Sequence, residues 1–112
     1  MQDAVDACNR GILHYTKGEF DRAIGAYDEA IRLDATYAKA YCCRADAYRQ
    51  KGDFDRAILD YTYALWLTPR YPAAYSGRGW ACWSQGNVEQ AIADFSHAIR
   101  FVPQHAVFYY YR

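Results

Sequence analysis

The chain has 112 residues, of which 53% are hydrophobic, and its thirteen basic side chains balance thirteen acidic ones. This composition predicts one folded domain with a continuous core, and the absence of net charge disfavours nucleic acid and anionic membranes as partners. No stretch approaches the ~20 apolar residues of a membrane-spanning helix, and the start lacks a secretory signal pattern, so we expect a soluble domain.

The cysteines of this chain form no C-x-x-C pair, and no histidine cluster lies near them. This spacing disfavours both a disulfide framework and a zinc site. We therefore expect no metal or cofactor, and we expect the thiols to be small buried apolar groups in a reducing, cytoplasmic compartment. The cysteines are Cys8, Cys42, Cys43 and Cys82.

A period of 34 residues organises the chain. Residues 17–27 read KGEFDRAIGAY, and residues 51–61 read KGDFDRAILDY. The same step separates Gly18, Gly52 and Gly86, and it relates further small and aromatic positions. We therefore expect three units and the start of a fourth, at residues 4–37, 38–71, 72–105 and 106–112.

Each unit has the pattern of a helix, a turn and a second helix. In the second unit, residues recur every three or four positions over 41–50, which predicts the first helix. Gly52 ends it, and Asp53 is suited to cap a second helix over 54–67 that stops before Pro69. Small residues stand where two such helices must approach closely, and large rings stand opposite them. Stacking of these pairs would bury apolar faces that one pair alone leaves exposed.

This combination of a 34-residue period, a G-[DE]-F turn and an A-x-x-x-[YF]-x-x-A helix resembles the tetratricopeptide repeat family over nearly the whole chain. Three positions depart from the family pattern: Ala7, Ala35 and Val88. The resemblance implies an all-α fold, a right-handed α-solenoid of stacked antiparallel helix pairs. It also implies a concave groove, lined by the first helices, that binds an extended peptide or a helix of a protein partner.

The resemblance places candidate partner-binding residues on the inward side of the first helices. Aromatic and apolar side chains lie at both ends of the expected groove, and charged ones lie in the middle. Tryptophan and tyrosine commonly carry interface energy, which favours binding over the alternative that these rings only cover helix contacts. The predicted binding residues are Ile12, Tyr15, Lys39, Asp46, Arg49, Trp80, Trp83, Tyr110 and Tyr111.

Some members of this family grip the acidic C-terminal tails of heat-shock chaperones with a carboxylate clamp of Lys, Asn and Arg side chains. The resemblance assigns the clamp to positions where this chain has no matching residue. Without those cations, the desolvation of two carboxylates would be uncompensated, so we expect no chaperone-tail binding. The positions are Cys8, Ile12, Cys43, Ala73 and Gly77.

The repeating arginines suggest ion pairs between neighbouring units. We expect Arg78 to pair with Asp60 and Arg112 with Asp94, whereas Arg44 lacks the corresponding partner because Ala26 stands there. On a second helix, Tyr63 and Trp66 occupy positions that are usually polar. They predict either a second contact patch on the convex face or a contact between copies of the chain.

No nucleophile beside a base, no paired carboxylates and no phosphate-binding loop occur, so we expect no enzymatic activity. The chain stops inside a helix that has barely begun, and an apolar VFYYY segment is a poor cap for a solenoid. We therefore expect either a fragment of a longer array or end-to-end self-association. Three roles remain open: a partner-binding scaffold, a self-assembly module, and a regulatory fragment of a larger multidomain protein.

Overall fold

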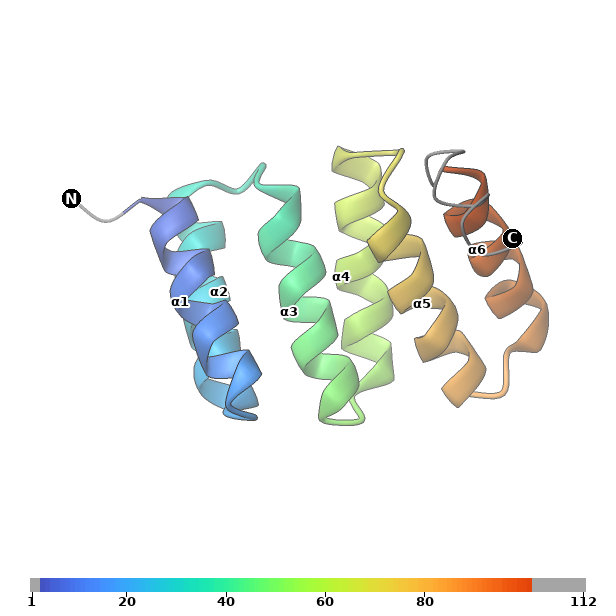
Figure 1. Cartoon of the computed structure of the whole chain (residues 1–112), viewed down its shortest axis with the longest axis horizontal. Helices are drawn as coiled ribbons and strands as arrows, with labels where there is room; N and C mark the ends of the chain where they lie inside the picture. The colour runs from blue at the N-terminus through green and yellow to red at the C-terminus, as the bar shows by residue number, and fades with distance from the viewer. Residues whose placement is uncertain (1–2, 102–112) are drawn as a thin grey trace, which may run out of the picture.

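Each 34-residue unit contributes one pair of antiparallel helices, and three such pairs stand side by side (Figure 1). The computed structural model describes residues 3–101. Within that range all regular structure is helical, as the sequence predicts for an all-α solenoid. The six helices are α1 (Ala4–Thr16), α2 (Phe20–Leu33), α3 (Ala38–Gln50), α4 (Phe54–Leu67), α5 (Pro72–Ser84) and α6 (Val88–Arg100).

The turn inside each hairpin depends on a glycine with positive φ. Gly18, Gly52 and Gly86 have φ angles of 77°, 82° and 82°, a region that L side chains rarely adopt. After the second turn, the Asp53 side chain accepts a hydrogen bond from the Arg56 backbone N–H and caps α4. The predicted helix over 54–67 is therefore confirmed, while the predicted helix over 41–50 begins three residues earlier, at Ala38.

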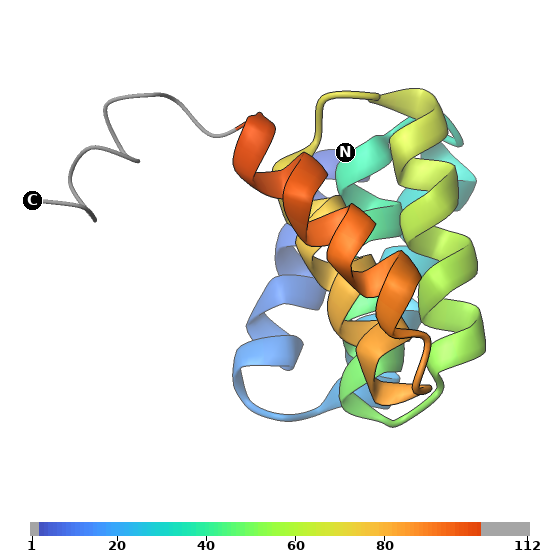
Figure 2. The same cartoon turned by 90° about the vertical axis from the view of Figure 1, so that its right-hand side faces the viewer.

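The helix pairs form two layers. The first helices, α1, α3 and α5, touch one another in sequence, and α2 and α4 lie behind them in Figure 1 and to their right in Figure 2. Each second helix contacts the first helix of its own hairpin, and α2 and α4 also contact the first helix of the next hairpin. We call the exposed surface of α1, α3 and α5 the first-helix face, and that of α2, α4 and α6 the second-helix face.

Large rings lie against small residues in the core, as the sequence predicts. A Cβ atom added to Gly11 would lie 2.4 Å from Cε1 of Tyr27, and one added to Gly79 would lie 2.7 Å from Cε1 of Phe95. Both contacts are within one hairpin. Tyr61 extends further, because its ring also lies directly against Gly77 in the next hairpin. Small side chains thus set the distance between helices.

The arginines pair differently from the sequence prediction. Arg78 donates to Asp94 of its own hairpin, at 2.8 Å from Nη2 and 3.0 Å from Nε, and not to Asp60. Asp60 instead accepts from Arg44, at 2.8 Å from both Nε and Nη2. Residues 16 positions apart lie opposite one another because the two helices of a hairpin are antiparallel and in contact.

The contact between hairpins uses the remaining nitrogen of each arginine. Nη1 of Arg44 donates to Asp28 of the preceding hairpin at 2.9 Å, so the prediction that Arg44 lacks a partner there is wrong. Nη1 of Arg78 donates to the Thr62 hydroxyl at 3.2 Å. Arg112, which was predicted to pair with Asp94, lies outside the described residues.

The cysteines are packed among the helices. Cys8, Cys42 and Cys82 are buried, and Cys43 is half-buried. Within residues 3–101, no helix is both long and apolar enough to cross a membrane.

Candidate functional site

Two tryptophans give the first-helix face its largest exposed rings. Trp80 and Trp83 lie one turn apart on α5, and each side chain is 54% exposed. Trp80 meets Phe95 of α6 edge-on, with the ring centroids 5.2 Å apart, so one side of its ring is supported by the hairpin. The tryptophans are therefore not sealed within the stack, and both present apolar area to solvent.

A hydrogen-bonded triad occupies the middle of the same face. The Tyr61 hydroxyl donates to Oδ1 of Asp46, and Arg49 Nε donates to the Tyr61 oxygen at 3.1 Å. Arg49 Nη2 also lies 3.6 Å from the same carboxylate oxygen. Asp46 and Arg49 were predicted as binding residues. Tyr61, which joins them from α4, was not among the predicted binding residues.

Burial raises the pKa of two members of this triad, Asp46 and Tyr61. Desolvation raises the pKa of the Asp46 carboxyl, although the Tyr61 hydroxyl and the Arg49 charge act in the opposite direction. Desolvation also raises the pKa of the Tyr61 phenol, and the nearby Asp46 charge raises it further. The phenol therefore stays protonated and remains a donor to Asp46 at neutral pH.

The other predicted binding residues differ in exposure. Ile12 and Tyr15 are half-buried, and the Tyr15 ring meets Phe20 edge-on at 5.4 Å. Lys39 is exposed at the start of α3. Tyr110 and Tyr111 lie outside the described residues.

The five positions that the family resemblance assigns to a carboxylate clamp carry no cation. Cys8 is fully buried and receives a hydrogen bond from the Cys43 thiol, which lowers the pKa of Cys8 to about 7 and raises that of Cys43. Gly77 is buried beneath the Tyr61 ring. Ile12 is half-buried and Ala73 is exposed, but neither has a polar side-chain group. These side chains supply no charge-assisted donor to a carboxylate.

An aromatic cluster lies away from these residues, on α4. Trp66 is 73% exposed and Tyr63 is 42% exposed. The ring centroid of Tyr63 lies 4.5 Å from that of Tyr41 and 5.7 Å from that of Trp66. The exposed pair that the sequence predicts is therefore backed by a third ring.

Sequence comparison identifies the repeat. The family models described as tetratricopeptide repeat and TPR repeat match residues 43–106 and 11–48, respectively. The chain belongs to the tetratricopeptide repeat family. Tetratricopeptide repeat proteins generally mediate protein–protein interactions, and their fold is typically a non-enzymatic scaffold. No curated protein sequence matches this tetratricopeptide repeat domain at a significant level.

Solved structures support the assignment. The second TPR of Spaghetti (RPAP3), bound to the HSP90 peptide SRMEEVD, is 30% identical with a TM-score of 0.87, covering 90% of this chain and 94% of that one. The Arabidopsis OM64 TPR domain is 33% identical with a TM-score of 0.88, covering 90% and 84%. MamA is 28% identical with a TM-score of 0.83, covering 88% and 58%.

Proposed function

We propose that this tetratricopeptide repeat domain binds a segment of a partner protein along the first-helix face, without a carboxylate clamp. The segment places an apolar side chain on Trp80 and Trp83 and a polar group beside Asp46. The observation that carries the proposal is the 54% exposure of both tryptophans, on the face where this family holds peptides. The proposed role requires no catalytic step.

The tryptophan pair suits an apolar anchor. Phe95 supports the Trp80 ring from behind, so a partner side chain would meet a surface that is already ordered. A rigid aromatic surface loses little conformational entropy when it is covered, and this favours affinity. The anchor is therefore best met by an aliphatic or aromatic residue of the partner.

The triad suits a polar contact near that anchor. Within residues 3–101, the contacts of Asp46 with Tyr61 and Arg49 all use Oδ1, which leaves Oδ2 available to a donor such as a backbone N–H of the partner. Because Tyr61 and Arg49 already hold the carboxylate in place, such a bond would need little reorganisation. This contact would fix the register of the bound segment.

The peptide SRMEEVD, which RPAP3 binds, provides a direct test of the clamp. Its acidic residues and terminal carboxylate need cationic partners, and the five clamp positions here have none. We expect no saturable binding of SRMEEVD up to about 1 mM by calorimetry, near the limit of a measurable weak complex. Micromolar binding would contradict the part of the proposal that excludes the clamp.

The binding face is tested with peptides selected from a random library on the wild-type domain. We expect the double variant Trp80→Ala/Trp83→Ala to lose about tenfold or more in affinity, as expected for two central aromatic residues. Trp66→Ala is the matched control, because it removes an exposed tryptophan from α4. Equal affinity of the wild type and the double variant would end the proposal.

Self-association is a second candidate, supported by apolar exposure on α6. Ile92 is 58% exposed and Ile99 is 64% exposed. Exposed aliphatic side chains of this kind are typical of interaction sites. Sedimentation equilibrium should then show a concentration-dependent dimer that Ile92→Asp weakens. A monomer at high concentration would rule this candidate out.

A further inference from the structure

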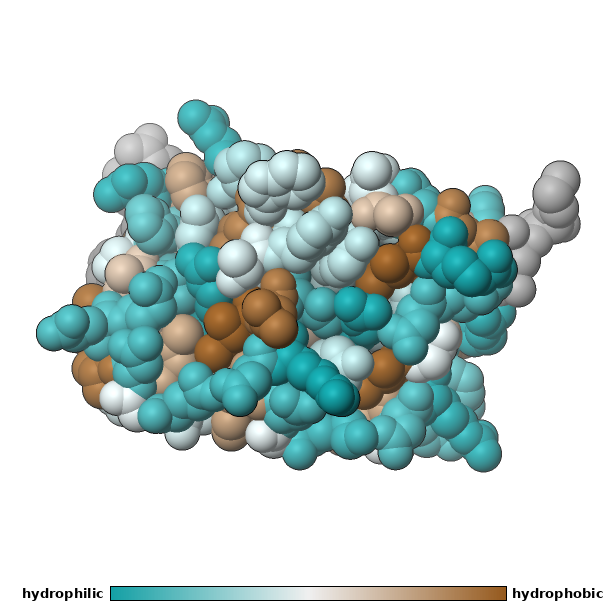
Figure 3. Space-filling view, turned by 180° about the vertical axis from the view of Figure 1, so that it is seen from behind, coloured by the Kyte–Doolittle hydropathy of each residue, from teal (hydrophilic) through white to brown (hydrophobic). Residues whose placement is uncertain are grey.

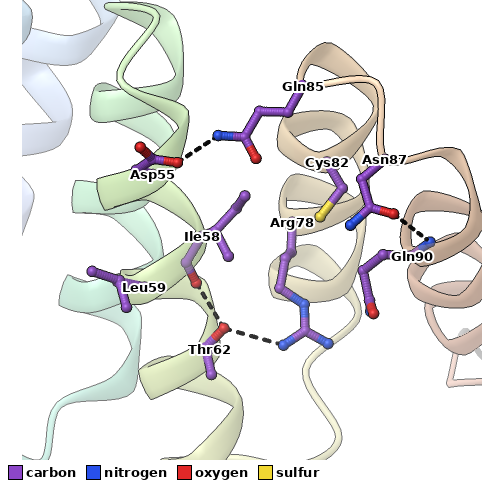
Figure 4. A pocket seen from close by; sticks show the side chains of 9 residues that line it. All are labelled: Asp55, Ile58, Leu59, Thr62, Arg78, Cys82, Gln85, Asn87 and Gln90. Carbon is purple, nitrogen blue, oxygen red and sulfur yellow. Dashed lines mark hydrogen bonds between the residues drawn. The ribbon is translucent and has the colours of Figure 1, made fainter.

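A pocket of about 720 Å³ opens on the second-helix face, between α4, α5 and α6 (Figure 4). Ile58 and Leu59 of α4 form one wall, and Cys82 of α5 and Gln90 of α6 lie across from them. Figure 3 views the molecule from behind and shows hydrophobic surface exposed among hydrophilic side chains. A volume of this size is in the range of ligand pockets.

The preceding repeat fills the corresponding place with an aromatic ring. Thirty-four residues before Cys82 stands Tyr48, and thirty-four residues before Gln90 stands Arg56. Tyr48 is half-buried against the core, and the Arg56 guanidinium carbon lies over its ring, 5.7 Å from the centroid. In the third repeat, the tyrosine is replaced by a thiol and the guanidinium by an amide. The third repeat therefore has no ring at the position that Tyr48 occupies in the second.

The charges around the pocket are already paired. Arg78 is held by Asp94 at 2.8 Å and by the Thr62 hydroxyl at 3.2 Å. Asp55, at the rim, accepts from the Gln85 amide at 2.6 Å. An ionic ligand would have to break these contacts, whereas a neutral ring would leave them intact and cover apolar wall.

Leu59 adds accessible apolar surface to one wall of a pocket whose other lining residues are mostly polar. Its side chain is 70% exposed, and the equivalent position of the first repeat is Gly25. A ring entering between Ile58 and Cys82 would cover part of Leu59 as well. Burial of aromatic and aliphatic carbon is favourable in proportion to the apolar area removed from water.

We propose that the pocket between α4, α5 and α6 receives an aromatic side chain of a partner protein docking on the second-helix face. The incoming ring takes the place that Tyr48 fills in the preceding repeat. The site is separate from the first-helix face, so the domain has two contact surfaces on opposite layers. This proposal does not depend on the function proposed for Trp80 and Trp83.

The test uses N-acetyl-L-tyrosinamide as a probe of a protein-borne ring, with N-acetyl-L-leucinamide as the aliphatic comparator. Methyl resonances of Ile58 and Leu59 are followed by NMR during titration of the whole chain. We expect saturable shifts with a Kd on the order of millimolar for the tyrosine probe, typical of a fragment of this size, and at least fivefold weaker binding of the leucine probe. Equal binding of the two probes, or no shift at Ile58 and Leu59, would overturn the proposal.

Three variants make the test specific. Cys82→Tyr supplies the ring internally and should abolish the shifts. Leu59→Asp places a charge on the exposed wall and should weaken binding at least fivefold without affecting the fold. Leu13→Asp is the matched control, because Leu13 is also an exposed leucine, at 62%, but lies on α1, which among the described helices contacts only α2 and α3. If Cys82→Tyr does not fold, Leu59→Asp decides the matter, and unchanged binding in that variant contradicts the site.

Discussion

Arg78 donates two hydrogen bonds to Asp94, a carboxylate with no solvent exposure, and so joins α5 to α6. Gln90 gives the same carboxylate a further hydrogen bond at 3.1 Å. The second hairpin repeats the pair as Arg44 and Asp60, but there the arginine also contacts Asp28. If its aspartate in the same hairpin is removed, Arg44 therefore keeps a carboxylate partner, Asp28, whereas Arg78 keeps the neutral Thr62 hydroxyl.

This difference predicts unequal effects of two equivalent substitutions. Asp94→Ala should lower the free energy of unfolding by about 3–5 kcal/mol, because Arg78 is left partly buried without a charged partner. Asp60→Ala should cost less, since Arg44 keeps Asp28. Urea denaturation of both variants measures the difference. An equal or larger loss for Asp60→Ala would show that the second carboxylate does not compensate.

Two helical glycines should respond to alanine in opposite directions. A Cβ at Gly77 would lie 2.3 Å from Cζ of Tyr61, so Gly77→Ala should destabilise by about 1–3 kcal/mol as the ring is displaced. Gly25 has nothing within 4 Å and lies within α2, so Gly25→Ala should stabilise by about 0.5–1 kcal/mol. Thermal unfolding with circular dichroism distinguishes them. Stabilisation by Gly77→Ala would contradict the close contact between Tyr61 and the third hairpin.

The raised pKa of Asp46 predicts a pH dependence. An acid whose pKa is higher in the folded state binds its proton more tightly there, so its contribution to stability is greatest below its unfolded pKa. The contribution declines as pH rises from about 4 through the folded pKa. The unfolding free energy of the wild type minus that of Asp46→Asn should therefore fall between about pH 3.5 and pH 7. A difference that grows over this range would show that Tyr61 and Arg49 outweigh burial.

The Tyr61 hydroxyl should hold the pKa of Asp46 down. Tyr61→Phe removes the donor to Oδ1 while keeping the ring against Gly77. We expect the Asp46 pKa to rise further, and the free energy of unfolding at neutral pH to fall by about 1 kcal/mol, the net contribution of one hydrogen bond to a half-buried acceptor. Carbon-detected NMR titration of the Asp46 carboxyl measures the first effect. An unchanged or lower pKa would exclude the hydroxyl as a significant donor.

The helices and turns could be predicted because their causes are local. Each signal acts on backbone only a few residues away: Gly52 has a positive φ, Asp53 caps a helix, and Pro69 follows its end. Local signals of this kind can be recognised from the sequence repeat alone. The exposure of Trp80 and Trp83 also follows from their register on a first helix. These features need no knowledge of how one hairpin sits on the next.

The pairings could not be predicted, because they depend on which of two flanking helices a long side chain reaches. Both helices that flank α5 carry a candidate aspartate for Arg78, which is Asp60 on α4 and Asp94 on α6. Only the packing of the helices selects Asp94. Tyr61 stands at the same repeat position as Tyr27 and Phe95, and nothing in that pattern indicates that its hydroxyl joins Asp46 to Arg49. The pocket lies beside Cys82, at the position where the preceding repeat has Tyr48. The sequence shows this replacement, but only the structure shows that a pocket opens there.

The most direct test of peptide binding on the first-helix face uses the three indole N–H resonances of the chain. A library-selected peptide is added to the ¹⁵N-labelled domain, and the indole signals of Trp66, Trp80 and Trp83 are followed. The account predicts saturable shifts for Trp80 and Trp83 and none for Trp66. Shifts confined to Trp66, or saturable binding that leaves the indoles of Trp80 and Trp83 unmoved, would contradict it.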